Sequence, residues 1–328
     1  MASQNVAVLK ETLSHFRAPI RYAFGYGSGV FQQAGYSAKS KPQTDFIFAV
    51  THPQHWHSLN LQQNRSHYSF LGTYGSGLVA NIQEKIGAGL YFNPYINIGG
   101  MTVKYGVVSI DTLCRDLLKW DTLYLAGRMH KPIQVLKDDS RIRAASQVNT
   151  ANAVRVALLM LPKEFTEEEL YMKIAGISYM GDFRMTVGEN PRKIHNIVQK
   201  QMEEFHNKYH DYIEGLSNTA FVRDGVIQQD DNPKILASMI QKLPESFLDK
   251  VMVQFDRDGQ PKSTDLSDEM EKYQLLSQSP NLSKYIATSV SQTVKKPAMM
   301  QSLKGIFTAG PLKSIKYAGE KLKKSRVK

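Results

Sequence analysis

The chain has 328 residues, of which 42% are hydrophobic and 10% aromatic, and its formal net charge is +11. This length and apolar content predict a substantial core and two domains with appendages, which excludes a disordered chain. The single cysteine, Cys114, excludes an internal disulfide and a multi-cysteine zinc site, and is typical of a reducing compartment. No run approaches the roughly 20 apolar residues that a membrane-spanning helix needs.

The first 17 residues predict a helix of the folded domain. Val6, Leu9, Leu13 and Phe16 recur near one face of such a helix. The segment lacks the apolar centre of a secretory signal, and Glu11 interrupts its sparse basic residues. It is therefore also a weak mitochondrial presequence, and it does not indicate a location.

A glycine-rich turn separates two predicted strands, Tyr22 to Gly25 and Asp45 to Val50. The residues of this turn that we expect to bind nucleotide are Tyr26, Gly27, Ser28 and Gly29. Glycines allow positive φ angles, so main-chain N–H groups can converge on an anion, and Ser28 adds a hydroxyl donor. Asp45 can hold Mg²⁺ against phosphate oxygens. Because many such turns are only tight turns and many such acids are solvated, the pattern alone leaves triphosphate binding open.

The rest of the first half predicts a mixed α/β unit. Two more strands are expected at Leu90 to Phe92 and Thr102 to Ser109, followed by a helix that Asp111 caps and that runs through Trp120. A long helix follows Ser140 and reaches Leu161, where Pro162 ends it. This helix contains our predicted domain boundary, at about residue 155.

Polar side chains that follow the second and third strands offer further candidates. His55, His57 and His67 are expected to pack or to hydrogen-bond substrate, because helix positions i and i+2 point to different faces and do not converge on a metal. Asn60 and Asn93 are candidates to bind the edge of a cytosine base. Their spacing does not distinguish CTP from other triphosphates.

Helices dominate the second half. Thr166 to Glu169 is a capping box that opens a helix through Ile174, and a longer helix fits Pro191 to Tyr212 with apolar residues on one side. Shorter elements are expected at residues 217–230, 234–249 and 267–294. The predicted division of the chain is 1–155, 156–294 and 295–328.

Residues 295–328 carry most of the excess charge: ten Lys or Arg against one acid, Glu320, give +9 of the total +11. After Gly310-Pro311, apolar residues gather on about one third of a helical wheel, which predicts a basic amphipathic helix. Each basic residue gains roughly 1 kcal/mol on an anionic membrane surface. The membrane-binding candidates are Lys313, Lys316, Lys321, Lys323 and Lys324. From the charge pattern alone, a solvated tail and an arm that binds nucleic acid remain alternatives to a membrane-binding helix.

Several segments resemble one family in the same order along the chain. They are Tyr26 to Tyr36, Asp45 to Val50, His55 to Asn60, His67 to Leu71, Lys104 to Ser109, Leu123 to Arg128 with Lys131-Pro132, Ile174 to Met185, and Lys304 to Gly310. Together they resemble the mitochondrial phosphatidate cytidylyltransferases over nearly the whole chain. The resemblance implies an α+β fold: a DNA polymerase β-like nucleotidyltransferase sheet with helices, then a mainly helical, winged-helix-like domain and the amphipathic tail.

The resemblance also implies a reaction. The family joins the CMP part of CTP to phosphatidic acid, releasing pyrophosphate and giving CDP-diacylglycerol for cardiolipin synthesis. The expected cofactor is Mg²⁺, and the expected location is the matrix face of the mitochondrial inner membrane. The expected partners are CTP, phosphatidic acid and an anionic membrane surface, without nucleic acid.

The resemblance assigns catalytic roles to four residues. Asp45 binds Mg²⁺, and Lys104 and Arg184 neutralise phosphates. The wider superfamily pattern expects a second acid two residues from the first, but Gln43 and Ile47 occupy those positions. Asp182 is the favoured second metal ligand, and Asp111 is the other candidate. No general base is expected, since the attacking phosphate is already anionic.

Two other functions remain open from the sequence. One is a non-catalytic maintenance factor for an inner-membrane protein translocator. In that case the missing acid at position 47 reflects a catalytic site that has decayed. The other is a nucleic-acid nucleotidyltransferase that uses the basic tail as an RNA arm. The sequence does not determine the acyl-chain preference or the oligomeric state.

Overall fold

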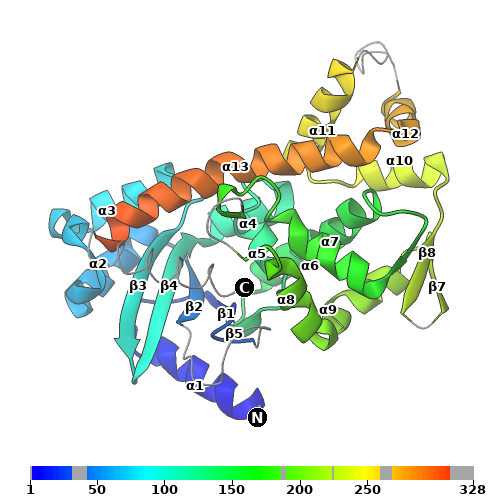
Figure 1. The fold of residues 1–328 in the computed structure, drawn as a ribbon. Coiled ribbons are helices and arrows are strands. Elements are labelled where there is room, and N and C mark those ends of the chain that lie inside the picture. The colour runs from blue at the N-terminus through cyan, green and yellow to red at the C-terminus, as the bar shows by residue number, and fades with distance from the viewer. Residues whose placement is uncertain (1, 32–42, 186–189, 224, 259–267, 311–328) are drawn as a thin grey trace.

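The computed structural model describes residues 2–31, 43–185, 190–223, 225–258 and 268–310. It is an α+β fold in which helices surround two sheets (Figure 1). The elements of the first half are α1 (Ala2–Ser14), β1 (Tyr22–Tyr26), β2 (Thr44–Val50), α2 (Pro53–Gln63), α3 (Gly75–Lys85), β3 (Tyr91–Ile98), β4 (Met101–Ser109), α4 (Ile110–Lys119), α5 (Ala126–Met129), β5 (Gln134–Lys137) and α6 (Ser140–Leu158). Those of the second half are β6 (Glu164–Thr166), α7 (Glu167–Ile177), the 3-10 helix η3 (Phe183–Met185), α8 (Lys193–Lys200), α9 (Met202–Glu214), β7 (Thr219–Arg223), β8 (Val226–Gln229), α10 (Pro233–Gln241), α11 (Glu245–Arg257), α12 (Glu269–Gln278) and α13 (Leu282–Ala309).

A five-stranded sheet forms the centre of the first half, with strand order β3-β4-β2-β1-β5. β2 lies parallel to β4, and the other neighbouring strands run antiparallel. Side chains of β2 alternate between the faces: Phe46 and Phe48 pack on one side, and Ile47 and Ala49 on the other. All four are fully buried, so β2 is covered on both faces, as its nearly continuous apolar run predicts.

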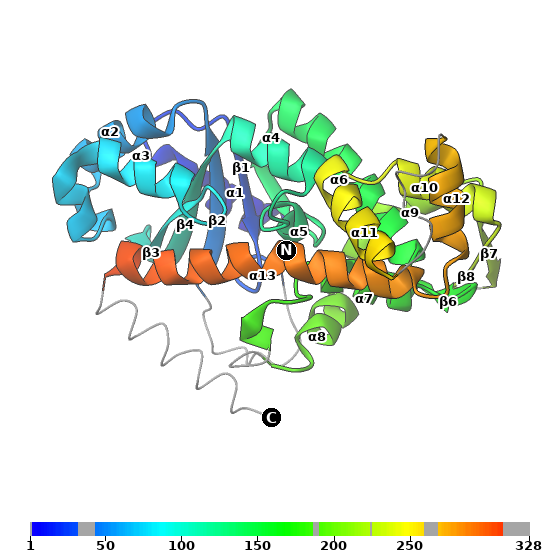
Figure 2. The same ribbon diagram turned by 90° about the horizontal axis from the view of Figure 1, so that it is seen from above.

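Different helices cover the two faces of this sheet. The face that carries Phe46 packs against Leu9 of α1, Trp56 of α2 and Phe16, which follows α1. The opposite face packs against α4 and α6, and its core continues into the helical half (Figure 2). Asp45 lies on this second face because it alternates with Phe46 along β2. The helical half therefore closes over the side of the sheet that carries the acid.

The second half is mainly helical and contains a small sheet with strand order β6-β8-β7. The predicted capping box opens α7: Thr166 Oγ1 accepts from Glu169 N at 3.2 Å, and Glu169 Oε2 accepts from Thr166 N at 2.7 Å. The helix predicted from Pro191 to Tyr212 is two helices, α8 and α9. They separate at Gln201, whose φ of −126° is not helical. Residues 217–230 contain the β7–β8 hairpin.

The long helix α13 connects the two halves. In both ribbon views it runs from α12 across to α3 (Figures 1 and 2). Near its end, Gln301 Nε2 donates to Leu90 O at 3.2 Å. Lys304 Nζ donates to Gln83 O at 3.3 Å and to Ile86 O, where α3 ends. The two lysine contacts satisfy carbonyl groups at the end of α3 that the helix itself leaves unpaired.

The structure corrects one predicted helix start and leaves other predictions untested. Ser109 caps α4, because its Oγ accepts from Thr112 N at 3.0 Å, so Asp111 lies in the first turn and is not the cap. α13 continues past residue 294, and the three-part division stays a prediction. The predicted amphipathic helix, with its five lysines, lies outside the described residues. Within the described ranges, no helix is long and apolar enough to cross a membrane.

Lys304 makes the stability of the fold depend on pH. Burial lowers the pKa of its ammonium group from 10.5 to about 7. Between these pH values the unfolded chain binds more protons than the folded chain, so the free energy of unfolding rises with pH. We expect urea denaturation to show this rise between pH 7 and pH 9, and up to about 2 kcal/mol of it to be lost in Lys304→Met.

The matched control is Lys296→Met, which makes the same change at an exposed position of the same helix. This variant is expected to keep the wild-type rise. An equal pH dependence in wild type and Lys304→Met would show that folding does not lower the pKa of Lys304.

Candidate active site

The glycine turn and Asp45 lie together at one end of the sheet. β1 and β2 pair with Tyr26 opposite Asp45, so the turn that follows β1 is next to the start of β2. Gly27 has a φ of +76°, and the N–H groups of Val30 and Phe31 donate to its carbonyl oxygen at 3.0 and 2.9 Å. A Cβ atom on Gly27 would lie 3.6 Å from Asp45 Oδ2. The structure therefore brings together the turn and the acid that the sequence assigns to a triphosphate and its metal.

Gly29 allows this turn to pack against the start of β2. A Cβ atom on Gly29 would lie 2.6 Å from Thr44 Cα and 2.7 Å from Gln43 O, which leaves no room for a side chain. The half-buried Ser28 lies between the two glycines. Close backbone packing thus fixes the position of the turn relative to the strand that carries Asp45.

Lys104 faces Asp45 across the parallel pair of strands. The two residues are partners in the register of β2 and β4, and Lys104 Nζ lies 3.1 Å from Asp45 Oδ1. The ammonium group also lies 4.6 Å from the centre of the Phe92 ring. The side chains of Lys104 and Asp45 are 18% and 26% exposed, so both remain accessible to a ligand.

Arg128 lies between two tyrosine rings beside Asp45. Its guanidinium carbon is 4.8 Å from the centre of the Tyr26 ring and 4.7 Å from that of Tyr124. Burial opposes the charge of Arg128, but the tyrosine oxygens and the Asp45 carboxylate raise its pKa, so the guanidinium stays charged. Burial raises the pKa of Tyr26 to about 12, so that phenol stays neutral.

Tyr124 lies where several cations meet. Burial alone would raise the pKa of its phenol, but the positive charges of Arg128, Arg184 and Lys104 lower it below the ordinary value. Three cations therefore lie near two carboxylates, Asp45 and Asp182, and this excess of positive charge favours anionic ligands. Phosphate groups are ligands of this kind.

A buried carboxylate holds the loop that carries Tyr124 and Arg128. Asp116 Oδ1 accepts hydrogen bonds from Thr122 N, Thr122 Oγ1 and Leu123 N at 2.8, 2.8 and 3.0 Å. Asp116 Oδ2 accepts from the N–H groups of the two residues before Gly127, at 2.9 and 3.0 Å. The loop includes a left-handed residue, Leu123, with a φ of 54°. A single acid thus determines the path of the backbone into the site.

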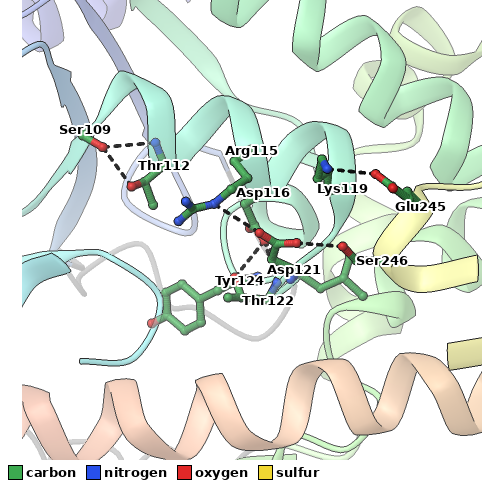
Figure 3. A network of polar contacts seen from close by, with 11 residues as sticks. Ser109, Thr112, Arg115, Asp116, Lys119, Asp121, Thr122, Tyr124, Glu245 and Ser246 are labelled. Atoms are coloured by element: carbon green, nitrogen blue, oxygen red, sulfur yellow. Dashed lines mark hydrogen bonds and ion pairs between the residues drawn. The ribbon is translucent and has the colours of Figure 1, made fainter. Parts of the chain in front are cut away.

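The same loop is joined to the helical half (Figure 3). Lys119 Nζ lies 2.8 Å from Glu245 Oε2, and Ser246 Oγ donates to Asp121 Oδ1 at 3.0 Å. Arg115 pairs with the other oxygen of Asp121 at 3.1 Å. Both links reach the first turn of α11, so the loop that positions Arg128 also contacts the second half of the molecule.

Asp182 and Arg184 form an ion pair with each other. Arg184 Nε lies 2.9 and 3.1 Å from the two carboxylate oxygens of Asp182, and Arg184 Nη2 lies 2.5 Å from Oδ2. Burial would raise the pKa of Asp182, but the Arg184 guanidinium and the charge of Lys193 lower it. As folded, both oxygens of Asp182 are hydrogen-bonded, so its predicted metal role requires this pair to separate.

Asp111 cannot share a metal with Asp45. Asp45 pairs with Lys104 and Val50 pairs with Ser109, so Asp111 follows the opposite end of the two strands. At about 3.3 Å per residue, the strand alone separates the two ends by about 16 Å. The side chain of Asp111 is 82% exposed and pairs with Arg141 at 2.8 Å.

The two predicted cytosine-binding residues are also placed elsewhere. Asn60 is fully buried and donates to the hydroxyl groups of Tyr68 and Tyr105, both at 2.9 Å. Asn93 is fully buried and pairs with Tyr105 and not with Lys104, so it lies on the face of the sheet opposite Asp45. Neither side chain lies beside Asp45, which the sequence did not indicate because spacing along the chain does not show which face a residue occupies.

His57 and His67 pack against neighbouring side chains as predicted, whereas His55 is exposed on α2. His57 is fully buried, with Nδ1 2.8 Å from Tyr68 Oη and Nε2 2.9 Å from Gln83 Oε1. Burial lowers its pKa to about 4, so it stays neutral. His67 Nδ1 lies 2.8 Å from the hydroxyl oxygen of Tyr105.

Sequence reasoning gave no role to Tyr124, Arg128 or Lys131. The available signal was the segment Leu123 to Arg128 with its neighbour Lys131, which resembles the family and contributes both cations. Lys131 Nζ donates to Gly127 O at 2.6 Å and to Ser178 Oγ at 2.8 Å. Burial and the charges of Arg128, Lys193 and Lys208 lower its pKa well below the ordinary value.

A glycine turn beside an accessible carboxylate, surrounded by cations, defines a protein that handles phosphate groups. A family model described as mitochondrial phosphatidate cytidylyltransferase matches residues 9–324. Similar proteins of that name come from Mus musculus (38% identity, 96% of this chain and 94% of the relative), Xenopus laevis (40%, 96% and 93%) and Saccharomyces cerevisiae (40%, 97% and 70%). The chain belongs to the mitochondrial phosphatidate cytidylyltransferase family.

Replacing Asp116 tests the role of the buried carboxylate. Asp116→Asn replaces one carboxylate oxygen with an amide NH₂ group. This group cannot accept hydrogen bonds, so the buried N–H donors that face it lose their partner. We expect the free energy of unfolding to fall by about 3 kcal/mol, measured by urea denaturation. Asp111→Asn, the same change on the exposed first turn of α4, is expected to cost less than about 1 kcal/mol. Similar losses in both variants would contradict the special role of Asp116.

Proposed function

We propose that this protein is a phosphatidate cytidylyltransferase, which converts CTP and phosphatidic acid to CDP-diacylglycerol and pyrophosphate. The observation that carries the proposal is the convergence of the glycine turn, Asp45, Lys104 and Arg128 in a member of this family. A non-catalytic maintenance factor is not favoured, because the relatives carry the name of an enzyme.

The chemistry joins two anions, and the residues of the site suit that task. A phosphate oxygen of phosphatidate attacks the α-phosphorus of CTP, and a new P–O–P linkage forms. The bond from the α-phosphorus to the oxygen that bridges to the β-phosphorus breaks, and pyrophosphate leaves with the electron pair. Lys104 and Arg128 offset the repulsion between the anions, and the backbone of the Gly27 to Gly29 turn holds the triphosphate. The nucleophile is already ionised, so no side chain needs to remove a proton.

Asp45 fits the requirements of a Mg²⁺ ligand. Magnesium in sites of this kind binds one or two carboxylates together with substrate phosphates, and Asp45 presents an accessible carboxylate beside the turn. When bound, Mg²⁺ would neutralise and orient the phosphate oxygens. Asp182 fits the same role only if Arg184 releases its carboxylate.

We also propose the finer fold assignment that the resemblance implies. The mixed sheet with an acid at the start of β2 supports a DNA polymerase β-like nucleotidyltransferase unit. The β7–β8 hairpin between helices supports a winged-helix-like second unit, with the hairpin as the wing. The metal and the two substrates would then meet where the helical half faces the sheet.

The proposed location is the matrix face of the mitochondrial inner membrane, with peripheral attachment. The relatives are named mitochondrial, and the basic segment after Gly310 has the composition of an interfacial helix. CDP-diacylglycerol made there would feed cardiolipin synthesis.

Deleting the chain after Gly310 tests this attachment. We expect the full chain to sediment with liposomes that contain phosphatidic acid or cardiolipin, and the truncated chain to remain in the supernatant. Liposomes of neutral phosphatidylcholine are the control and should sediment neither protein. Equal sedimentation of both proteins would exclude the tail as the anchor, and tail-dependent, salt-sensitive RNA binding without liposome binding would favour a nucleic-acid arm.

Asp45→Asn tests the enzyme and its metal ligand together. Because this change removes the charge but keeps the shape, we expect CDP-diacylglycerol formation from CTP, phosphatidic acid and Mg²⁺ in mixed micelles to fall at least about 100-fold. Pyrophosphate release should fall in parallel. The control Asp111→Asn should retain activity. If the wild-type protein is folded and binds lipid but forms no CDP-diacylglycerol, the proposed reaction is overturned. If Asp45→Asn forms CDP-diacylglycerol at the wild-type rate, only the metal role of Asp45 is overturned.

A further inference from the structure

A groove of about 490 Å³ lies in the helical half, outside the site around Asp45. Its walls come from α7, η3, α8 and the end of α6. The apolar side chains that line it are Leu161, Met172, Tyr179, Met180, Met185 and Ile194. All six are half-buried, so they present apolar surface that the described part of the chain does not fully cover. The volume is within the range of small-molecule binding sites.

A glycine in the wall keeps this groove open. Gly176 is the last residue but one of α7, and its φ is not in the left-handed region, so the backbone there does not require glycine. A Cβ atom there would meet only Ile194 Cδ1, at an ordinary contact distance of 3.7 Å. Packing within the described chain therefore does not require glycine at this position. Space for a ligand is a physical reason for it.

Two lysines flank the tyrosine at the edge of the groove. Lys131 Nζ lies 4.8 Å from the centre of the Tyr179 ring, and Lys193 Nζ lies 5.1 Å from it. An apolar groove with two lysine side chains around one wall residue suits an amphiphile with an anionic head, because a phosphate beside Lys131 would favour the charged form of that buried amine. A triphosphate, which is polar throughout, does not match this lining.

Arg128 connects the groove with the site around Asp45. Its guanidinium carbon lies 4.8 Å from the centre of the ring of Tyr26, the strand partner of Asp45, and Lys131 Nζ donates to the carbonyl oxygen of Gly127, the residue before Arg128, at 2.6 Å. The positive charge thus continues from the acid and glycine turn to the lysines beside Tyr179. A lipid whose phosphate is held by these lysines would have its acyl chain in the groove. Its phosphate oxygen atoms would then lie on the side of the nucleotide.

We propose that the groove beside Tyr179 binds an acyl chain of phosphatidic acid, while Lys131 and Lys193 bind the phosphate of the same lipid. This inference rests on the proposed function and names the acceptor side of the site. It makes Gly176 and Met180 determinants of acceptor chain length. It also makes the two lysines binding residues for acceptors of any chain length.

Filling the groove tests the acyl-chain role. Gly176→Leu introduces a better helix-forming residue whose side chain enters the groove, so the variant is expected to fold. We expect the KM for dioleoyl phosphatidic acid to rise about 10-fold or more, and the KM for water-soluble dihexanoyl phosphatidic acid and for CTP to change less than about 2-fold. Gly176→Ala should give a smaller effect in the same direction. Met180→Trp is a second variant that fills the same space from another wall position.

Lys193→Met tests the phosphate-binding role separately from the acyl-chain role. Removing this charge should raise the KM of the long-chain and the short-chain acceptor by similar factors, unlike the groove variants. Val253→Trp, on the exposed side of α11, is the control for a bulky substitution and should change neither value. A Gly176→Leu variant and a Met180→Trp variant that both keep the wild-type preference for dioleoyl over dihexanoyl phosphatidic acid would overturn the groove assignment.

A direct binding measurement tests the groove assignment without depending on the reaction. Phosphatidic acid with a diazirine on one acyl chain is photolysed with the wild-type protein without CTP, and the labelled peptides are identified by mass spectrometry. We expect labelling in the segment from Met172 to Met185, reduced in Gly176→Leu. Labelling elsewhere would overturn the inference even if CDP-diacylglycerol is formed, and labelling here in a protein that forms no CDP-diacylglycerol would overturn the proposed function alone.

Discussion

The hydrogen bonds of Asp116 determine where the cationic side of the site lies. This buried carboxylate accepts from backbone N–H groups along the irregular loop between α4 and α5, whose donors have no helix or strand partner. A buried charge is tolerated in such a place because several donors replace its water. The loop can therefore hold left-handed backbone at Leu123 and carry Tyr124 and Arg128 onto the face of the sheet that bears Asp45.

The site that results has one accessible carboxylate and an excess of cations. That balance suits a reaction between two anionic substrates, in which repulsion must be offset before the reacting atoms can meet. Arg128 is central to the balance, since the Asp45 carboxylate supports its charge and its own charge reaches Lys131. The nucleotide side and the acceptor side of the proposed site would thus share one guanidinium group.

The helical half contributes to this site and does not simply extend the fold. α13 runs from α12 to α3 and bonds to the end of α3 through Lys304, while α11 bonds to α4 and the following loop through Glu245 and Ser246. α7 packs against α6, which covers the acid-bearing face of the sheet, and Lys131 Nζ donates to Ser178 Oγ at the end of α7. The groove walls and the Asp45 site are therefore parts of one packed structure.

The sequence by itself determined the features that depend on neighbours along the chain. It located the glycine turn and Asp45, the buried strand β2, the capping box at Thr166 and the membership of the family, because each is written in consecutive residues or short spacings. It did not show that Lys104 is the partner of Asp45, that Arg128 lies between two tyrosines, or that Asn60 and Asn93 are buried away from the acid. Those facts follow from the register between β2, β4 and β3 and from the Asp116 hydrogen bonds. Only the tertiary structure decides them, since they join residues far apart in the chain, and a shift of one position in a strand exchanges its two faces.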